Sequence, residues 1–260
     1  MAAPANLELT DEECVARIAA ARPEVLVPGF WATLASNCGD WAKEISASPY
    51  WQQARKRLEE WRAEYRTQTG DDLISQTFLE DFVPKSEGRI REKLIHRIKR
   101  GKEDPAAAIQ ANGPPIPRLN DLVRTRVACR YIDGVEFLGG KLLGLADELQ
   151  IENSIDKQGR IEGYFAQHVS IVLPVFYRVG GVPQSTQITC EIQLASDMAT
   201  QMWKTAHPLY EDARLGPNEP EVWQWKSDDP RFISHQLGHM IHLADGLLVQ
   251  LRELLRKKNL

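Results

Sequence analysis

The stretch TQITCEIQLA, residues 186–195, decides the fold, because its strict alternation is typical of a β-strand with two unlike faces. Ile188, Cys190, Ile192 and Leu194 form an apolar face that predicts burial in a core. The opposite face carries Gln187, Thr189, Glu191 and Gln193. Burying a carboxylate and an amide two residues apart costs free energy unless they have partners. This polar face therefore either lines a cleft or faces solvent.

The segments around this strand predict a sheet covered by helices. Strands are expected at 124–132 and 168–175, and helices at 134–150, 196–211 and 231–257. Before them, helices are expected at 11–21, 30–46 and 50–67, the first opened by a capping box of Thr10 and Glu13. The Pro- and Gly-rich segment 104–118 is typical of a loop. The fold class expected is α/β (α+β), a mixed sheet flanked by helices, with a helical N-terminal region, 1–75, and a catalytic-type domain, 76–260.

Composition narrows the classes of function. The 260 residues carry 32 Lys and Arg against 36 Asp and Glu, a net charge of −4, so no global positive field favours nucleic acid or an anionic membrane. The four cysteines are far apart, without the spacing of a disulfide scaffold or a C-x-x-C metal site. The first residues lack the basic and apolar regions of a signal peptide, and no long apolar run follows. We expect a reduced, cytoplasmic protein that does not bind membranes, with the tryptophans at 31, 41, 51 and 61 as packing residues.

Charge is concentrated in one segment. Residues 85–102 hold eight Lys and Arg against two Glu, a local net charge of +6 in an acidic chain. Such a segment fits a triphosphate or a nucleic-acid backbone, and equally a solvated helix face. Asp121 then precedes a strand that carries Arg124 and Arg126. A carboxylate beside guanidinium groups is an arrangement that can hold Mg²⁺ and a nucleotide together.

Four fragments, taken in order, resemble the RelA/SpoT nucleotidyltransferases, which synthesise the alarmone (p)ppGpp. Asp121-Leu122-Val123-Arg124-Thr125-Arg126 looks like the family's D-L-x-G-x-R strand start, and Gly163-Tyr164-Phe165-Ala166-Gln167-His168 looks like its guanine-stacking loop. Glu191-Ile192-Gln193-Leu194-Ala195-Ser196 is similar to its Glu-Ile-Gln signature strand, and His207 lies sixteen residues after the glutamate, as in the family. The resemblance covers about residues 82 to 211 and implies the family's synthetase fold.

The resemblance also implies roles for individual residues. Asp121 and Glu191 would hold Mg²⁺ as the cofactor, and Glu191 would take the proton from the attacking ribose hydroxyl. The ATP-binding residues would be Lys85, Lys93, Arg97 and Arg126, with Lys93 on the phosphates and Arg126 stacked on the adenine. The acceptor-binding residues would be Tyr164, Arg160, His168 and Gln193, with Tyr164 stacked on the base. The implied reaction is pyrophosphokinase chemistry, in which the diphosphoryl group carries charge that cations must stabilise.

Departures from the family pattern concentrate on the acceptor side. Phe165 replaces a basic residue, Gln167 an aliphatic one, and Ala195 the arginine of the signature strand, while Val83 stands where an arginine is usual. Donor chemistry therefore looks retained and guanosine specificity is open. The acceptor is a guanine nucleotide, an adenine nucleotide or the 3′ CCA end of tRNA, the last as in toxic small alarmone synthetases. A catalytically inactive nucleotide-binding protein is the alternative to an enzyme. The partners that the resemblance allows are a cognate antitoxin or a second copy of the chain.

The histidines near the C-terminus present a different metal pattern. His235 and His239 are four residues apart, as in a zincin helix, with His242 beyond. Gln236 occupies the position at which a metalloprotease needs its glutamate base. Helix packing is therefore the role expected of these histidines. The sequence also lacks a His-Asp dipeptide, so we expect synthesis without the metal-dependent alarmone hydrolase activity of long family members.

Overall fold

The alternating stretch forms the inner part of β5 (Val182–Ser196), the central strand of a five-stranded sheet. The strand order is β1-β2-β5-β4-β3. The other strands are β1 (Val83–Pro84), β2 (Val123–Cys129), β3 (Asn153–Gly159) and β4 (Phe165–Val179). The predicted apolar face of β5 is buried, with Ile188, Cys190, Ile192 and Leu194 at most 3% exposed. The prediction of a mixed sheet with flanking helices is confirmed.

The computed structural model describes residues 9–160, 163–215 and 223–258. The chain divides into two compact units, each assembled from separate stretches of sequence. The first unit comprises 1–48, 81–124 and 172–191, and the second comprises 49–80, 125–171 and 192–260. Strands β2, β4 and β5 each pass from one unit into the other. Among the described residues, no helix combines the length and apolar character that a membrane crossing requires.

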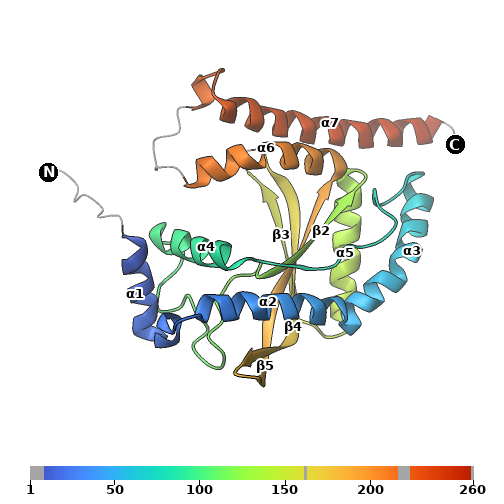
Figure 1. Cartoon of the computed structure of the whole chain (residues 1–260). Helices are drawn as coiled ribbons and strands as arrows, with labels where there is room; N and C mark the ends of the chain where they lie inside the picture. Colours follow the sequence, from blue (N-terminus) through green and yellow to red (C-terminus); the bar gives the residue numbers. More distant parts are fainter. Residues whose placement is uncertain (1–8, 161–162, 216–222, 259–260) are drawn as a thin grey trace. The chain divides into compact units, whose positions relative to one another are not determined.

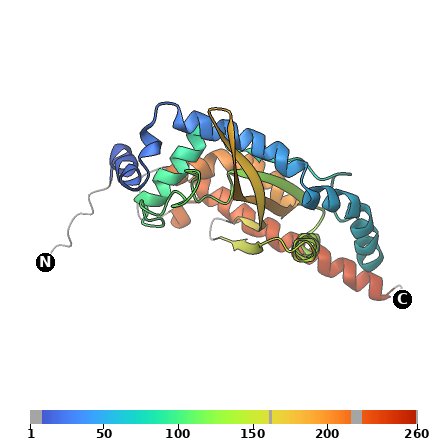
Figure 2. The ribbon, with the colours of Figure 1, turned by 90° about the horizontal axis from the view of Figure 1, so that it is seen from below.

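Three helices build most of the first unit: α1 (Asp11–Ala21), α2 (Phe30–Ser46) and α4 (Glu87–Lys99), with the short 3-10 helix η1 (Pro23–Leu26). The capping box predicted for α1 is confirmed: Glu13 N donates to Thr10 Oγ1 at 3.2 Å, and Thr10 N donates to Glu13 Oε2 at 2.8 Å. Helix α4 packs against both α1 and α2 (Figure 2). Trp41 Nε1 donates to the Phe176 carbonyl at 3.0 Å, which joins α2 to β4.

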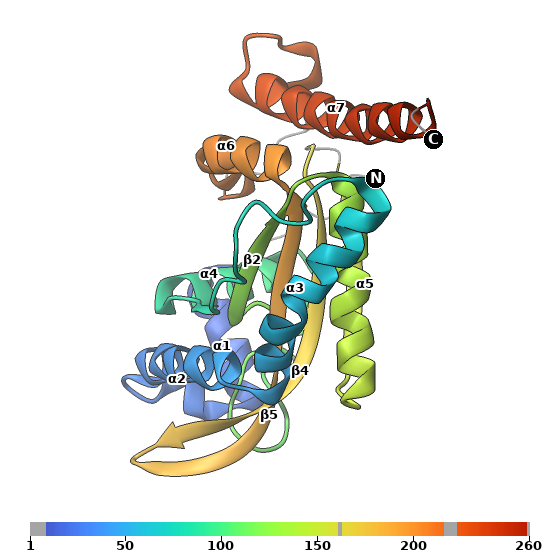
Figure 3. The ribbon, with the colours of Figure 1, turned by 90° about the vertical axis from the view of Figure 1, so that its right-hand side faces the viewer.

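The second unit contains α3 (Pro49–Thr69), α5 (Ile132–Glu148), α6 (Asp197–Leu215), α7 (Pro230–Lys258) and the 3-10 helix η2 (Trp223–Trp225). Helix α3 lies beside α5, which also packs on β3 (Figure 3). Helices α6 and α7 lie against each other (Figure 1). Trp41, Trp51 and Trp61 are buried, as predicted, whereas Trp31 is partly exposed.

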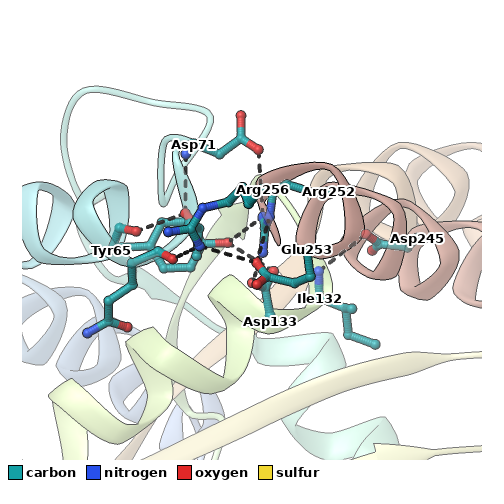
Figure 4. Close-up of polar contacts among 10 residues, drawn as sticks. Tyr65, Asp71, Ile132, Asp133, Asp245, Arg252, Glu253 and Arg256 are labelled. Atoms are coloured by element: carbon teal, nitrogen blue, oxygen red, sulfur yellow. Dashed lines mark hydrogen bonds and ion pairs between the residues drawn. The ribbon is translucent and has the colours of Figure 1, made fainter. Parts of the chain in front are cut away.

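A polar cluster fixes the C-terminal half of α7 to this unit (Figure 4). The guanidinium of Arg252 forms an ion pair with Asp133, at the start of α5, and lies 3.4 Å from the hydroxyl of Tyr65 on α3. About two helical turns before Arg252 on α7, Asp245 Oδ1 accepts a hydrogen bond from Ile132 N at 3.3 Å. Helix α7 is therefore bound to two other helices through buried or half-buried polar groups.

The predicted helices and strands all occur, with ends shifted by a few residues. Among the described residues, one α-helix, two strands and the two 3-10 helices were not predicted. Helix α4 buries Ile90, Leu94, Ile95 and Ile98, a helical pattern hidden among charged residues. Strand β3 is a polar edge strand that pairs antiparallel with the next strand in the sequence, β4, with Ile155 opposite Val169. The two residues of β1 pair with the first residues of β2.

Candidate active site

A buried carboxylate between two lysines is the main polar feature of the first unit. Asp121 Oδ2 lies 2.7 Å from Lys85 Nζ and 2.8 Å from Lys93 Nζ. Asp121 comes two residues before β2, Lys85 lies between β1 and α4, and Lys93 is on α4. Lys85 N also donates to the Leu122 carbonyl at 2.8 Å, so the pairing of β1 with β2 continues to the site and holds Lys85 beside Asp121. The structure thus brings together three residues that the sequence analysis assigned to the donor side.

The two lysines determine the charge of Asp121. Burial alone would raise the pKa of this carboxyl, but the charges of Lys93 and Lys85 outweigh burial and lower the pKa to about 2. Burial lowers the pKa of the Lys85 ammonium, and this outweighs the opposing effect of Asp121. Asp121 Oδ1 is buried and has no hydrogen-bond partner among the residues that the structure describes. An ionised carboxylate therefore keeps one oxygen without a partner in a cationic setting.

This oxygen fits a divalent cation. Mg²⁺ in proteins is commonly held by one or two carboxylates, with phosphate oxygens and water completing its shell. Among the described residues, no group of three or more His, Cys, Asp or Glu gathers as a metal site. Glu191, the second predicted ligand, is 9% exposed on β5, the strand next to β2, and belongs to the same unit as Asp121. Asp121 Oδ1 is thus one oxygen ligand available to a divalent cation.

The basic segment is largely paired with acidic side chains. Arg97 lies 2.7 Å from Glu103, Lys99 lies 2.6 Å from Asp11, and Arg89 lies 3.2 Å from Glu92. With the two lysines on Asp121, five of the eight cations between 85 and 102 contact a carboxylate. Arg97, predicted to bind ATP, therefore does not join Lys85 and Lys93 on Asp121.

The predicted acceptor residues meet around Tyr164 in the second unit. The Tyr164 hydroxyl is 2.9 Å from His168 Nε2, and the Arg160 guanidinium lies over the Tyr164 ring at 5.7 Å. The ring of Trp203, on α6, packs on Tyr164 with 4.6 Å between centroids and 53° between planes. Gln193 joins the same area and accepts a hydrogen bond from Arg126 Nη2 at 3.3 Å. Along the predicted polar face of β5, the side chains of Glu191 and Gln193 are buried, whereas that of Gln187 is exposed.

These residues line a small pocket. Arg126, Tyr164 and Gln193 form its polar part, and Trp203, Gly238 and His242 belong to its wall on α6 and α7. Its free volume is about 20 Å³. This is roughly the space for one water molecule and far below the several hundred Å³ of a typical small-molecule site.

Helix α7 approaches this pocket through two glycines. Gly163 has a φ of +73°, and a Cβ on Gly238 would lie 2.4 Å from the Gly163 carbonyl oxygen. The ring of Phe165 stacks on His242 with centroids 3.7 Å apart and planes 5° apart, and meets the His239 ring edge-on at 5.4 Å. His239 and His242, two of the three histidines singled out in the sequence, therefore pack α7 against the start of β4.

The sequence analysis missed the residues that α6 and α7 bring to the pocket. Trp203 carries no motif, and its helical spacing predicts only packing. Gly238 lies 75 residues after Gly163 and meets it only because α7 folds back on the loop, and His242 lines the same pocket. The side chain of His207, which the sequence analysis singled out, lies outside the described residues.

Comparisons with known proteins show which solved structures have a similar fold. No family model matches the sequence, and no curated protein matches it. The structure is similar to that of small alarmone synthetase 1 from Bacillus subtilis, with 16% identity, a TM-score of 0.50, and coverage of 84% of this chain and 98% of that one. The same enzyme bound to its product pppGpp gives a TM-score of 0.49 at 16% identity, covering 84% of this chain and 99% of that one. A GTP pyrophosphokinase family protein from Streptococcus pneumoniae is 18% identical, with a TM-score of 0.46 and coverage of 84% and 97%. The chain has the fold of a small alarmone synthetase.

Proposed function

We propose that this chain is a Mg²⁺-dependent pyrophosphokinase that transfers the β,γ-diphosphate of ATP to a ribose hydroxyl of a purine nucleotide. The observation that carries the proposal is Asp121, buried and ionised between Lys85 and Lys93, with one oxygen left without a partner. The alarmone synthetase fold and the order of the four motifs support it. Belonging to the RelA/SpoT family is part of the same proposal.

The donor side requires positive charge around a triphosphate. Lys93 would contact the ATP phosphates, and Lys85 would hold Asp121 and lie beside the adenine, with Arg126 on the other face of the base. Asp121, with Glu191, would bind Mg²⁺, which when bound neutralises charge on the transferred diphosphoryl group. Because the two lysines lower the pKa of Asp121 to about 2, the carboxylate is ready to bind a cation at any physiological pH.

The acceptor side requires a base and a surface for a purine. Glu191 would take the proton from the ribose hydroxyl as that oxygen attacks the β-phosphorus of ATP, and AMP leaves. Tyr164 would stack on the acceptor base, while Arg160, His168 and Gln193 would contact its phosphates or ribose. A free nucleotide is favoured over tRNA because Arg89, Arg97 and Lys99, which lie beside the two donor-side lysines in the basic segment, already contact carboxylates.

The test follows the label of γ-³²P-ATP with Mg²⁺ and, in separate reactions, GDP, GTP, ADP, ATP alone or bulk tRNA. We expect AMP release together with transfer of label to a purine nucleotide, and loss of both on adding EDTA. Label on tRNA would replace the proposed acceptor. Absence of AMP with every acceptor, in protein whose circular dichroism shows it folded, would contradict the proposed activity.

A further inference from the structure

The ring of Tyr164 is already covered in the folded chain. The Arg160 guanidinium lies over the ring at 5.7 Å, and the indole of Trp203 packs on it with 4.6 Å between centroids. The pocket that Tyr164 and Trp203 line has a free volume of about 20 Å³. A purine base needs far more room than this, so it can lie on Tyr164 only after a side chain of the pocket has moved.

Trp203 is the side chain that is placed to move. It is half-buried on α6, and the next residue of the helix, Lys204, is exposed, so solvent lies beside the indole. Tyr164, by contrast, comes directly after Gly163, which lies against Gly238 of α7. Side chains with an exposed side change rotamer rapidly, whereas the backbone that carries Tyr164 is held by a neighbouring helix. The indole, rather than the Tyr164 ring, can therefore turn outward.

The indole of Trp203 has the outline of a purine. Both consist of a six-membered ring fused to a five-membered ring, so an indole on Tyr164 covers the area that a purine would cover. The planes of Trp203 and Tyr164 meet at 53°, which lies between the offset-stacked and edge-to-face arrangements that aromatic pairs prefer. A base that lies parallel to Tyr164 would exchange this contact for a better one.

Thr200, one turn before Trp203 on the same face of α6, has a buried hydroxyl without a partner. The residue is 4% exposed and lines the same pocket, and its Oγ1 has no hydrogen-bond partner among the described residues. A helical threonine commonly bonds the carbonyl four residues earlier, as Thr205 does with the Gln201 carbonyl at 3.2 Å. The ring carbons of an indole cannot satisfy such a hydroxyl, whereas the polar groups on the edge of a purine can.

We propose that the indole of Trp203 occupies, in the free protein, the place on Tyr164 that the acceptor base takes, and that the bound base displaces the indole and forms a hydrogen bond with the Thr200 hydroxyl. The inference rests on the proposed function, which supplies the purine acceptor, and it adds two residues of α6 to the acceptor site. Trp203 opposes acceptor binding because its contact with Tyr164 must break. Thr200 favours binding because its hydroxyl gains a partner.

Titration calorimetry on the full chain tests the role of Trp203. Mg²⁺ and α,β-methylene-ATP are present throughout, because the methylene bridge of this donor analogue replaces the bond that the transfer would break. GDP, ADP and CDP are then titrated in separate experiments. Trp203→Ala should tighten the binding of at least one purine nucleotide about threefold to tenfold, since an aromatic pair no longer has to separate. Trp225→Ala removes an indole that is 91% exposed and should change none of the three affinities.

Trp203→Phe keeps a smaller ring on α6 and should give an affinity between those of wild type and Trp203→Ala. The phenylalanine variant preserves the test if the alanine variant does not fold. Unchanged or weaker purine binding in the folded variants overturns the proposal. An equal gain for CDP overturns it as well, because a pyrimidine lacks the fused ring that replaces the indole.

Thr200→Val keeps the shape of the side chain and removes its hydroxyl. Because this hydroxyl is buried without a partner, the urea midpoint of unfolding should stay the same or rise. Purine binding should nevertheless weaken about threefold to tenfold, which a merely structural role would not produce. Thr205→Val is the matched control on α6, and it should leave purine binding unchanged because the Thr205 hydroxyl is bonded within the helix. Unchanged purine binding in Thr200→Val overturns the proposal.

The outcomes separate this inference from the proposed reaction. Turnover of γ-labelled ATP tests the reaction itself, whereas the calorimetry measures binding without turnover. AMP release without the shifts in affinity would leave the pyrophosphokinase in place and remove Trp203 and Thr200 from its acceptor site. The shifts in affinity without AMP release would support the inference and contradict the reaction.

Discussion

Asp121 uses its two oxygens differently: Oδ2 contacts two lysines, while Oδ1 is buried without a partner. A buried oxygen without a hydrogen-bond partner costs about 1–3 kcal/mol. The cost is recovered if a cation binds Oδ1 during the reaction. Asp121 is therefore the carboxylate whose replacement is the most informative test of the site.

Asp121→Asn and Glu191→Gln should each lower kcat for AMP release at least about 100-fold, since one removes a cation ligand and the other the base. Turnover with γ-labelled ATP and the preferred acceptor measures this effect. Glu12→Gln, an exposed acid in the first turn of α1, is the matched control and should retain full activity. Normal turnover in either site variant, with an unchanged circular dichroism spectrum, would remove that residue from the mechanism.

Tyr164→Ala should raise the KM for the acceptor about tenfold and leave the KM for ATP nearly unchanged, because stacking on a base contributes about 1–3 kcal/mol. Tyr164→Phe keeps the ring and loses only the hydroxyl, which is 2.9 Å from His168 Nε2, so its acceptor KM should lie closer to wild type. Steady-state kinetics with each substrate varied in turn separates the two constants. Equal KM values for Ala and wild type would refute a stacking role.

Residues that belong to a motif could be recognised from the sequence. Residues outside the motifs that contact them in the folded chain could not. Asp121, Lys85 and Lys93 were predicted to act together, and the structure brings them together. Tyr164 and His168 were predicted to serve one acceptor, and they contact each other. Trp203 has no motif of its own, and its contact with Tyr164 depends on the angle at which α6 leaves β5.

At the scale of elements, the close approach of α7 to the loop before β4 depends on Gly238. Gly238→Ala would place a Cβ 2.4 Å from the Gly163 carbonyl oxygen, so α7 must shift, and we expect a loss of about 1–3 kcal/mol in the free energy of unfolding. Gly246→Ala is a control on the same helix, where a Cβ has no neighbour within 4 Å, and it should stabilise by about 0.5–1 kcal/mol. Urea denaturation of both variants measures the contrast. Equal effects of the same sign would show that the approach is not tight.

Arg252 connects α7 to α5 and α3, so Arg252→Leu should destabilise the protein by about 3 kcal/mol, because it leaves Asp133 without its ionic partner. The double variant Arg252→Leu with Asp133→Asn removes both charges and should recover part of this loss. Lys257→Leu, at an exposed position near the end of the helix, should have little effect. Thermal unfolding of wild type, of the single variants Arg252→Leu and Asp133→Asn, and of the double variant forms the comparison, and full additivity in the double variant would contradict the pairing.

Elements with a regular apolar pattern were predictable, and elements without such a pattern were not. Strand β5 and helix α7 show their periods in the sequence. Helix α4 has a narrow apolar stripe among many charges, and β3 has no apolar face that repeats over more than a few residues. For β3, pairing with the edge of β4 takes the place of a strong local pattern.

For the whole molecule, the shared strands should couple the unfolding of the two units. Strands β2, β4 and β5 continue from one unit into the other, so neither unit keeps its share of the sheet intact if the other unfolds. We expect one calorimetric transition, with calorimetric and van't Hoff enthalpies in agreement once the data are corrected for any association. Two resolved transitions would show that the units are independent.

Sequence reasoning proposed a division of the chain at residue 75, and that division stays a prediction. The compact units are each built from three separated stretches, such as 1–48, 81–124 and 172–191. Which stretches come together depends on strand pairing and helix contacts between residues more than a hundred positions apart, as for Trp41 and Phe176. Periodicity identifies faces to be buried but does not identify the surfaces that bury them.

The turn between β4 and β5 gives the molecule a point where chain can be added. It consists of Gly180 and Gly181, both with positive φ, and a Cβ on either would meet nothing within 4 Å. The flanking Val179 and Val182 are half exposed or more. Exposed turns of small residues are where inserted peptides disturb a fold least. An affinity tag or a fluorescent peptide placed there leaves the residues of the Asp121 site unchanged.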